Sequence, residues 1–160
     1  MTEHSKLDSL DEIDRLMLQA LQENGRVSNA DLARQTNLSP PAIHARLRRL
    51  EQQGFIQRYV AIVDRESVGF DMLCFINVAI QVHQLEAVAK FRDALRLMPE
   101  VLECHHVTGE YDYLLKVVIR NRKDLERFVM DQLTPIPGIS KIHTSLALSE
   151  IKATTALPID

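Results

Sequence analysis

The sequence of 160 residues has little of several residue types, and each shortage excludes a class of protein. The two cysteines, Cys74 and Cys104, are too few for a disulfide framework or a paired zinc motif, so we interpret both as small core residues. Five glycines and six prolines exclude a collagen-like or low-complexity chain. The longest apolar run, residues 72–76, is far shorter than the roughly 18 residues that suggest a membrane span. Since the acidic start also lacks the features of a signal peptide, we expect a cytoplasmic protein with no membrane partner.

Catalytic motifs are also absent, because no Gly-rich phosphate loop and no nucleophile elbow occurs in the sequence. Two groupings could suggest acid/base or metal chemistry: Glu110 with Asp112, and Cys104 with His105 and His106. Successive residues of a strand point to opposite faces, so Cys104 and His106 would remain two ligands short of a zinc site. We therefore expect no enzyme activity, no metal site and no cofactor.

Charge is unevenly distributed along the chain, although the net charge is only −3. Residues 1–25 carry six acidic residues against Lys6 and Arg15. Residues 26–62 carry six arginines against Asp31 and Glu51, which makes this segment +4. The local field decides whether a polyanion is attracted, because screening limits its reach to about 8 Å at physiological salt. This segment therefore favours a nucleic-acid partner.

The first forty residues contain the signals of two helices. Apolar residues at helical spacing predict a first helix that stops at Asn24-Gly25, where the glycine could adopt a left-handed cap. Ser28 followed by Asp31 has the form of a capping box, which predicts a second helix from Asn29 to about Thr36 with Leu32 and Ala33 facing inward. The inward residues of the first helix would be Leu10, Ile13, Leu16, Met17, Ala20 and Leu21.

A third helix opens at Ser39-Pro40 and ends near Gly54, since Ser39 can cap free amides and proline is tolerated at the first helical position. Only Asn37 and Leu38 connect it to the second helix, and Asn37 tolerates a positive φ, so the pattern predicts a helix-turn-helix. The stripe Ile43, Leu47 and Leu50 would pack inward. A basic triplet alone is typical of a solvated face, but in this context we predict DNA contacts from the outward and flanking residues Ser39, Pro41, Ala42, His44, Ala45, Arg46, Arg48 and Arg49.

After Gly54, residues 55–63 partly alternate between apolar and polar side chains. This pattern predicts a strand or short β-wing. From such a wing, Arg58 and Tyr59 would contact the phosphate backbone of DNA.

The last ninety residues repeat the order strand, helix, strand, which predicts a ferredoxin-like βαββαβ sandwich. The fold class is therefore α+β, with a winged helix-turn-helix in residues 1–62, a linker in 63–70 and the sandwich in 71–160. RNA-recognition modules share this fold, but residues 113–119 lack their aromatic motif. The predicted strands are Leu73–Val82, Val101–Thr108, Tyr113–Ile119 and Ile139–Leu148, and the predicted helices are Glu86–Leu97 and Lys123–Leu133.

The first predicted strand is apolar on both faces, with Ile76, Val78 and Ile80 alternating with Phe75 and Ala79. Helices can cover only one of these faces in a two-layer sandwich. The other face would expose an apolar patch larger than monomers usually tolerate. We therefore predict that two copies of the chain pair through their sheets.

The turn Val107-Thr108-Gly109-Glu110-Tyr111-Asp112-Tyr113 resembles the signature turn of the Lrp/AsnC effector domain. The DNA-binding half of the same family is resembled by Asp14-Arg15, Leu21–Arg26, Leu38-Ser39-Pro40 and Arg48–Ile56, so the resemblance covers nearly the whole chain. Two departures are small: Glu110 stands where the family often has Asp, and Pro40-Pro41 differs from many members.

The resemblance implies a transcription regulator that binds double-stranded DNA and responds to a small effector of the amino-acid class. It also implies a homodimer that often assembles into tetramers or octamers, with the effector bound between effector domains. The turn can supply backbone amides near Glu110 and Tyr111 for a carboxylate, and the Asp112 carboxylate for an ammonium. The predicted effector-binding residues are Val107, Thr108, Gly109, Glu110, Tyr111, Asp112, Thr144 and Ser145.

Overall fold

The computed structural model describes residues 9–81 and 85–159. The chain forms two compact units, the first made of Met1–Ile62 with Lys152–Asp160 and the second of Val63–Ile151. The C-terminal segment from Lys152 thus groups with the N-terminal unit, whereas the sequence had suggested that it belongs to the sandwich. Predictions that fall on residues 1–8, on Val82 and on Asp160 lie outside the described residues.

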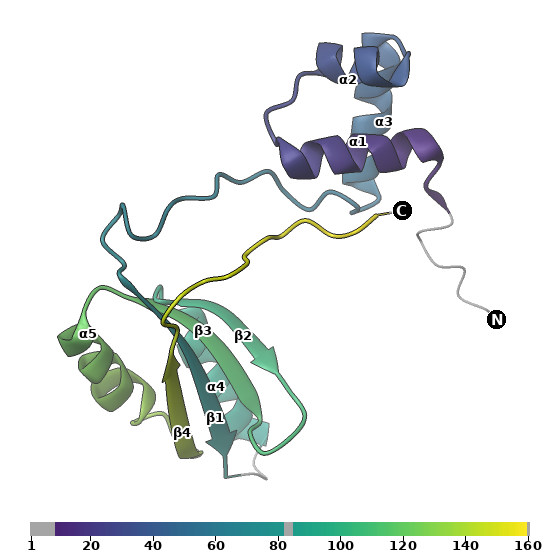
Figure 1. The fold of residues 1–160 in the computed structure, drawn as a ribbon. Coiled ribbons are helices and arrows are strands. Elements are labelled where there is room, and N and C mark those ends of the chain that lie inside the picture. The colour runs from purple at the N-terminus through teal and green to yellow at the C-terminus, as the bar shows by residue number, and fades with distance from the viewer. Residues whose placement is uncertain (1–8, 82–84, 160) are drawn as a thin grey trace. The chain divides into compact units, whose positions relative to one another are not determined.

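The first unit contains the three predicted helices, α1 Glu12–Glu23, α2 Asn29–Thr36 and α3 Pro40–Gln52 (Figure 1). Side-chain caps begin each of them: Asp11 for α1, Ser28 for α2 and Ser39 for α3. Asn37 has a φ of 55°, so it makes the left-handed turn between α2 and α3 that the sequence predicted. By contrast, Gly25 does not adopt a positive φ, and α1 ends on the extended residue Asn24.

The core of the first unit follows the predicted stripes with one change. Ile43, Leu47 and Leu50 of α3 are buried together with Leu32 and Ala33 of α2. On α1, the predicted inward residues lie on the core side except Leu16, which is 46% exposed, and Leu18 is buried in addition. The remaining buried members are Leu10 and Met17.

The C-terminal segment docks on α1 within this unit. The side-chain amide of Gln22 donates to the carbonyl of Leu157 at 3.1 Å, and its oxygen accepts from the Leu157 amide at 2.6 Å. Gln19 donates to the carbonyl of Ile159, whose side chain packs against the helical core. This segment therefore contributes to the hydrophobic core of the DNA-binding unit.

The strand predicted over residues 55–63 is wrong for this chain, since none of these residues, all described, belongs to a strand. A strand needs a partner for its backbone amides and carbonyls, and this chain supplies none here. Phe55 and Ile56 still pack against the helical core, while Val60, Ile62 and Val63 are exposed.

The second unit is a sheet with two helical segments, in the order β1 (Met72–Ile80), α4 (Leu85–Arg96), β2 (Val101–His106), β3 (Tyr113–Ile119), α5 (Arg122–Arg127) and β4 (Ile139–Leu146). A π-helical segment, η2 (Phe128–Leu133), follows α5 directly. All strand pairs are antiparallel, and the strand order is β2-β3-β1-β4. This is the predicted ferredoxin-like topology, although β2 and β4 end two residues earlier than expected.

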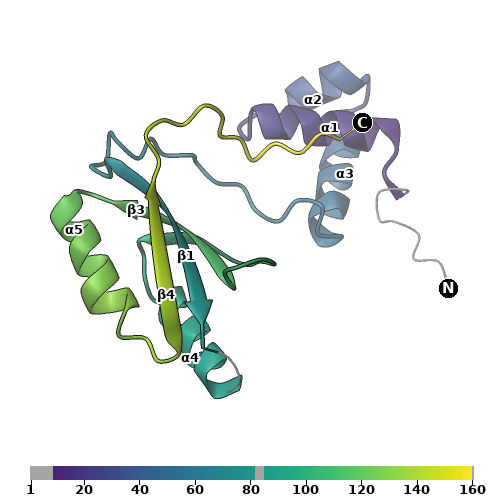
Figure 2. The ribbon, with the colours of Figure 1, turned by 60° about the horizontal axis from the view of Figure 1, so that its bottom comes forward.

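Both helical segments cover the same face of the sheet (Figure 2). Ile76, Val78 and Ile80 of β1 face them and join Phe91 and Phe128 in the core. The opposite face is open and mixed in character, because Phe75 lies beside Asn77 on β1 and pairs with Lys116 on β3. The open face is therefore less apolar than the sequence suggested.

Candidate functional site

The outward side of α3 is formed by small residues and one extended cation. Pro41, His44, Ala45 and Arg48 are exposed, and Ala42 is half-buried. Ser39 accepts a hydrogen bond from the Ala42 amide at 3.4 Å, so it acts as the cap of the helix. Small side chains near a helix N-terminus allow close approach to a groove, and a guanidinium further along can reach base edges.

Arg46 and Arg49, by contrast, pair with carboxylates of the same unit. Arg46 donates to Asp11 at 2.6 Å and to Asp14 at 2.9 Å, and Arg49 donates to the second oxygen of Asp14. Asp14 is fully buried, and it also closes the capping box of α1 with Asp11. The two arginines therefore anchor α3 to the start of α1.

The electrostatic state of this cluster follows from its hydrogen bonds. Burial opposes the ionisation of Asp11, but hydrogen bonds from the Asp14 amide and from Arg46 outweigh it and hold the pKa of Asp11 below its ordinary value. The hydrogen bond to Asp11 raises the pKa of Arg46. Both shifts favour the ion pair between Asp11 and Arg46, so the charge of this predicted DNA-binding arginine is partly neutralised within the unit.

The prediction for Arg49 is therefore corrected in one respect. Helical geometry had placed this side chain on the outward face, whereas its guanidinium turns back to Asp14. A carboxylate that is buried without a partner is energetically costly. Pairing the Arg49 guanidinium with the buried Asp14 carboxylate is therefore favoured over leaving that guanidinium in solvent. Arg48 keeps its outward position, without an ion-pair partner in the part of the chain described.

Beyond α3, Arg58 is exposed in the irregular segment that replaces the predicted wing. The hydroxyl of Tyr59 donates to Glu51 at 3.0 Å. Burial, followed by this hydrogen bond, raises the pKa of Tyr59 to about 12. Arg58 thus keeps its side chain available for a phosphate, while Tyr59 is engaged with α3.

The turn at residues 107–112 is exposed at its tip and anchored at its base. Gly109 has a φ of 122°, a conformation that side chains disfavour. The amide of Val107 donates to the carbonyl of Asp112 at 2.9 Å, and the amide of Asp112 donates to the carbonyl of Val78 at 3.0 Å. These bonds close the turn and fix it against β1.

Asp112 has a structural partner that the sequence did not indicate. The register of β1 with β4 shifts between Ala79 and Ile80, and the Asp112 carboxylate accepts the Ile80 amide at 2.7 Å. A carboxylate can accept further hydrogen bonds, so the second oxygen of Asp112 can still receive an ammonium. Any test of this residue must keep an acceptor for Ile80.

Two residues of β4 reach the turn and were missed by sequence reasoning. Lys141 donates to Glu110 at 2.6 Å and lies 4.9 Å from the ring centre of Tyr111. His143 also approaches the Tyr111 ring, with 6.3 Å between centroids. The hydrogen bond with Lys141 lowers the pKa of Glu110 and raises that of Lys141. No sequence signal links these residues, because their contact depends on strand register.

Thr144 and Ser145, the other predicted effector residues, lie on opposite faces of the sheet. Thr144 pairs with Ile76 on the face covered by helices, whereas Ser145 pairs with Phe75 on the open face. His143 and Lys141 share the face of Ser145, so Ser145 and not Thr144 lies on the side from which the turn is contacted.

Within residues 9–81 and 85–159, no group of three or more His, Cys, Asp or Glu side chains is placed to hold a metal ion. In the same ranges, no helix has the length and apolar character needed to cross a membrane.

Comparison with protein families also divides the chain into two parts, although the second match extends into the C-terminal segment that groups with the first unit of the fold. Residues 10–57 match a winged helix-turn-helix DNA-binding domain, and residues 73–157 match the Lrp/AsnC ligand binding domain.

Comparison with individual proteins gives matches over nearly the full length. The chain is 34% identical over 151 residues to the transcriptional regulator AzlB of Bacillus subtilis, covering 94% of this chain and 96% of the relative. It is 36% identical over 150 residues to the HTH-type transcriptional regulator FL11 of Pyrococcus horikoshii, covering 94% and 97%. The solved complex of the transcriptional regulator NMB0573 with L-Met from Neisseria meningitidis has a TM-score of 0.91 at 39% identity, covering 94% of this chain and 97% of that one.

Proposed function

Because this chain belongs to the Lrp/AsnC family of transcriptional regulators, we propose that α3 binds the major groove of operator DNA and that an amino acid bound at the 107–112 turn controls this binding. The chain is accordingly a DNA-binding regulator with a ligand-binding domain. Its cytoplasmic location, where chromosomal DNA would be reached, is part of the proposal.

The DNA-binding proposal rests on the different contacts that the arginines of α3 make. Arg46 and Arg49 are held by Asp11 and Asp14, so they fix the orientation of the helix. Arg48 extends from the outward face beside His44 and Ala45. An anchored helix that presents one unpaired guanidinium is suited to bidentate contact with a guanine.

We predict that Arg48→Ala weakens specific binding to the DNA upstream of the protein's own gene by about 1 to 3 kcal/mol without changing thermal stability. Gel shift and melting temperature measure the two quantities. Arg122→Ala, which makes the same charge change on the other unit, serves as the control. Unaltered affinity of Arg48→Ala would remove this residue from the interface.

Arg58→Ala should instead lower the salt dependence of DNA binding, because it removes a phosphate contact.

The effector proposal is supported by the charges that the turn brings together. Glu110 and Asp112 offer acceptors for an ammonium group, and Lys141 offers a donor for a carboxylate. The Glu110–Lys141 pair is exposed, so a zwitterion can exchange with it at little cost. The solved structure of NMB0573, which is similar to this chain, is a complex with L-Met, and this supports an amino acid as the ligand class.

We expect a thermal-shift screen of the proteinogenic amino acids, beginning with L-methionine, to find a ligand that raises the melting temperature. Asp112→Asn keeps an acceptor for the Ile80 amide but removes the charge, and it should weaken calorimetric binding of that ligand about tenfold or more. Asp131→Asn, an exposed change elsewhere in the same unit, is the matched control. Binding by Asp112→Asn at parental strength would refute the assigned role.

The proposal includes a homodimer formed through the open face of the sheet, which can assemble further into tetramers or octamers. Phe75 on this face is 37% exposed, and Leu114 beside it is half-buried. Glu103 on the same face pairs with Lys116 and with His105. A mixed surface of this kind is typical of an interface with a small apolar centre and a polar rim.

A further inference from the structure

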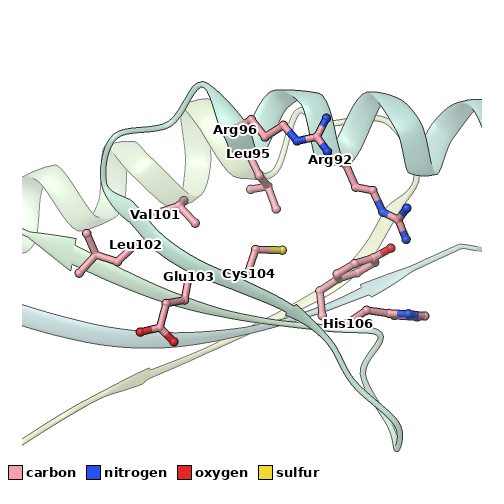
Figure 3. Close-up of a pocket in the computed structure, with 9 residues that line it drawn as sticks. Arg92, Leu95, Arg96, Val101, Leu102, Glu103, Cys104 and His106 are labelled. Carbon is pink, nitrogen blue, oxygen red and sulfur yellow. The ribbon is translucent and has the colours of Figure 1, made fainter. Parts of the chain in front are cut away.

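A cavity of about 480 Å³ lies between α4 and the edge strand β2. None of the residues of the 107–112 turn lines it, so it is separate from the proposed amino-acid site. Figure 3 shows Arg92 and Leu95 extending from α4 toward the sheet and Cys104 extending from β2 toward the helix. The residues that line the cavity include Arg92, Leu95, Val101, Cys104, His106 and Tyr113.

The cavity holds one uncommitted positive charge. Arg92 has no ion-pair partner in the described part of the chain. The other charged side chains at the rim are engaged, since Arg96 pairs with Asp93 at 3.0 Å and Glu103 pairs with Lys116 at 3.2 Å. Cys104, which the sequence suggested to be a core residue, is instead exposed on the edge strand. Partial burial raises the pKa of its thiol, and the Arg92 guanidinium partly offsets this effect.

The rest of the lining is largely apolar. Leu95 and Tyr113 are buried in the core of the unit, and Val101 packs against that core. His106 stacks on the Tyr113 ring with 5.0 Å between centroids. Small-molecule sites combine such apolar walls with a few placed polar groups. The chemistry therefore suits a ligand with one anionic end and a hydrocarbon body.

We propose that this cavity is a second ligand site, which binds a small organic carboxylate through Arg92 with its aliphatic chain against Leu95, Val101 and Cys104. The planar guanidinium matches a carboxylate with two parallel hydrogen bonds. An inorganic anion would leave the apolar wall uncovered, and a neutral molecule would leave Arg92 unpaired. His106 and Tyr113 pair across the base of the 107–112 turn, so a bound carboxylate contacts the strands that carry the effector turn.

Cys104 provides a reporter inside the cavity. The chain has only two cysteines, and the other, Cys74, is fully buried. Alkylation of the full-length protein by iodoacetamide, a neutral reagent, therefore measures access to Cys104. Hexanoate should slow this reaction saturably, whereas hexanol and inorganic phosphate should not slow it at the same concentrations. Absence of saturable protection by hexanoate, or equal protection by hexanol or phosphate, overturns the proposal.

Substitutions test whether Arg92 is the cation that binds the hexanoate carboxylate. In Arg92→Gln, the concentration of hexanoate that gives half-protection should rise about tenfold or more. The ratio of rates with and without hexanoate is the quantity compared, because Arg92 also affects the thiol itself. Lys90→Gln removes a charge from the same helix, where Lys90 pairs with Glu86 at 2.8 Å, and should retain full protection. Unchanged protection in Arg92→Gln, or an equal loss in Lys90→Gln, contradicts the assignment.

Discussion

At the scale of single residues, Asp14 organises the DNA-binding unit. Its carboxylate is fully buried, and each oxygen accepts from a different arginine of α3. A buried charge is tolerated only when it is paired and hydrogen-bonded. Asp14 therefore ties two side chains of α3 to the start of α1, in addition to the apolar packing between the helices.

Asp14→Asn keeps the shape and one acceptor but leaves Arg46 and Arg49 without their shared charge. We expect it to lower the free energy of unfolding of the DNA-binding unit by about 2 to 3 kcal/mol, less than for fully buried pairs because both guanidiniums reach solvent. Urea titration followed by hydrogen exchange in α1 and α3 measures the loss. Asp31→Asn, at the exposed pair with Arg34, should cost clearly less, because solvent screens this pair. Equal effects of the two changes would refute the anchoring role.

The arginines also show where residue-level prediction reached its limit. Spacing identified the buried stripe of α3 correctly, because period alone determines which residues share a face. It could not indicate that Arg49 turns back toward α1, because a long side chain follows the charges around it. The acids at positions 11 and 14 were visible in the sequence, but their proximity to α3 was not.

At the scale of elements, the C-terminal segment is the main departure from expectation. Its described residues, 152–159, have no regular secondary structure, yet Ile159 packs into the helical core and Gln22 binds both backbone groups of Leu157. The first unit is thus built from both ends of the chain. The periodicity of the sequence could not reveal this, since a short irregular segment has no pattern to detect.

We predict that Ile159→Ala destabilises the DNA-binding unit by about 1 kcal/mol, because it removes partly buried aliphatic surface from the core. Leu157→Ala should leave stability unchanged, since the Leu157 side chain is 70% exposed and its bonds to Gln22 use the backbone. Hydrogen exchange of the α1 amides compares the two variants. If both variants, or neither, loosen α1, the segment does not dock as described.

At the scale of the whole molecule, the open sheet face is the surface proposed for self-association. β1 places Phe75 and Asn77 on this face, and β3 adds Leu114 and Lys116. The patch mixes apolar and charged residues, so its apolar centre is small. Phe75 is the largest apolar side chain among these four, which makes it the residue on which pairing should depend most.

Phe75→Lys should shift the full-length protein from dimer toward monomer, because it places a cation at the centre of the proposed interface. Light scattering at a concentration where the parent protein is dimeric measures the change. Leu97→Lys introduces the same residue at a position that is 83% exposed beyond the end of α4, and it should leave the mass unchanged. A dimer that survives Phe75→Lys must use another surface.

The sequence by itself determined the helix boundaries of the first unit, the βαββαβ order and the inward face of each main element, because caps, spacing and alternation are local properties. Tertiary structure decided which charged side chains remain unpaired on α3, which β4 residues reach the effector turn, and to which unit the C-terminal segment belongs. Each of these depends on contacts between residues far apart in the chain. Such contacts are set by strand register and helix packing, which a linear pattern does not encode.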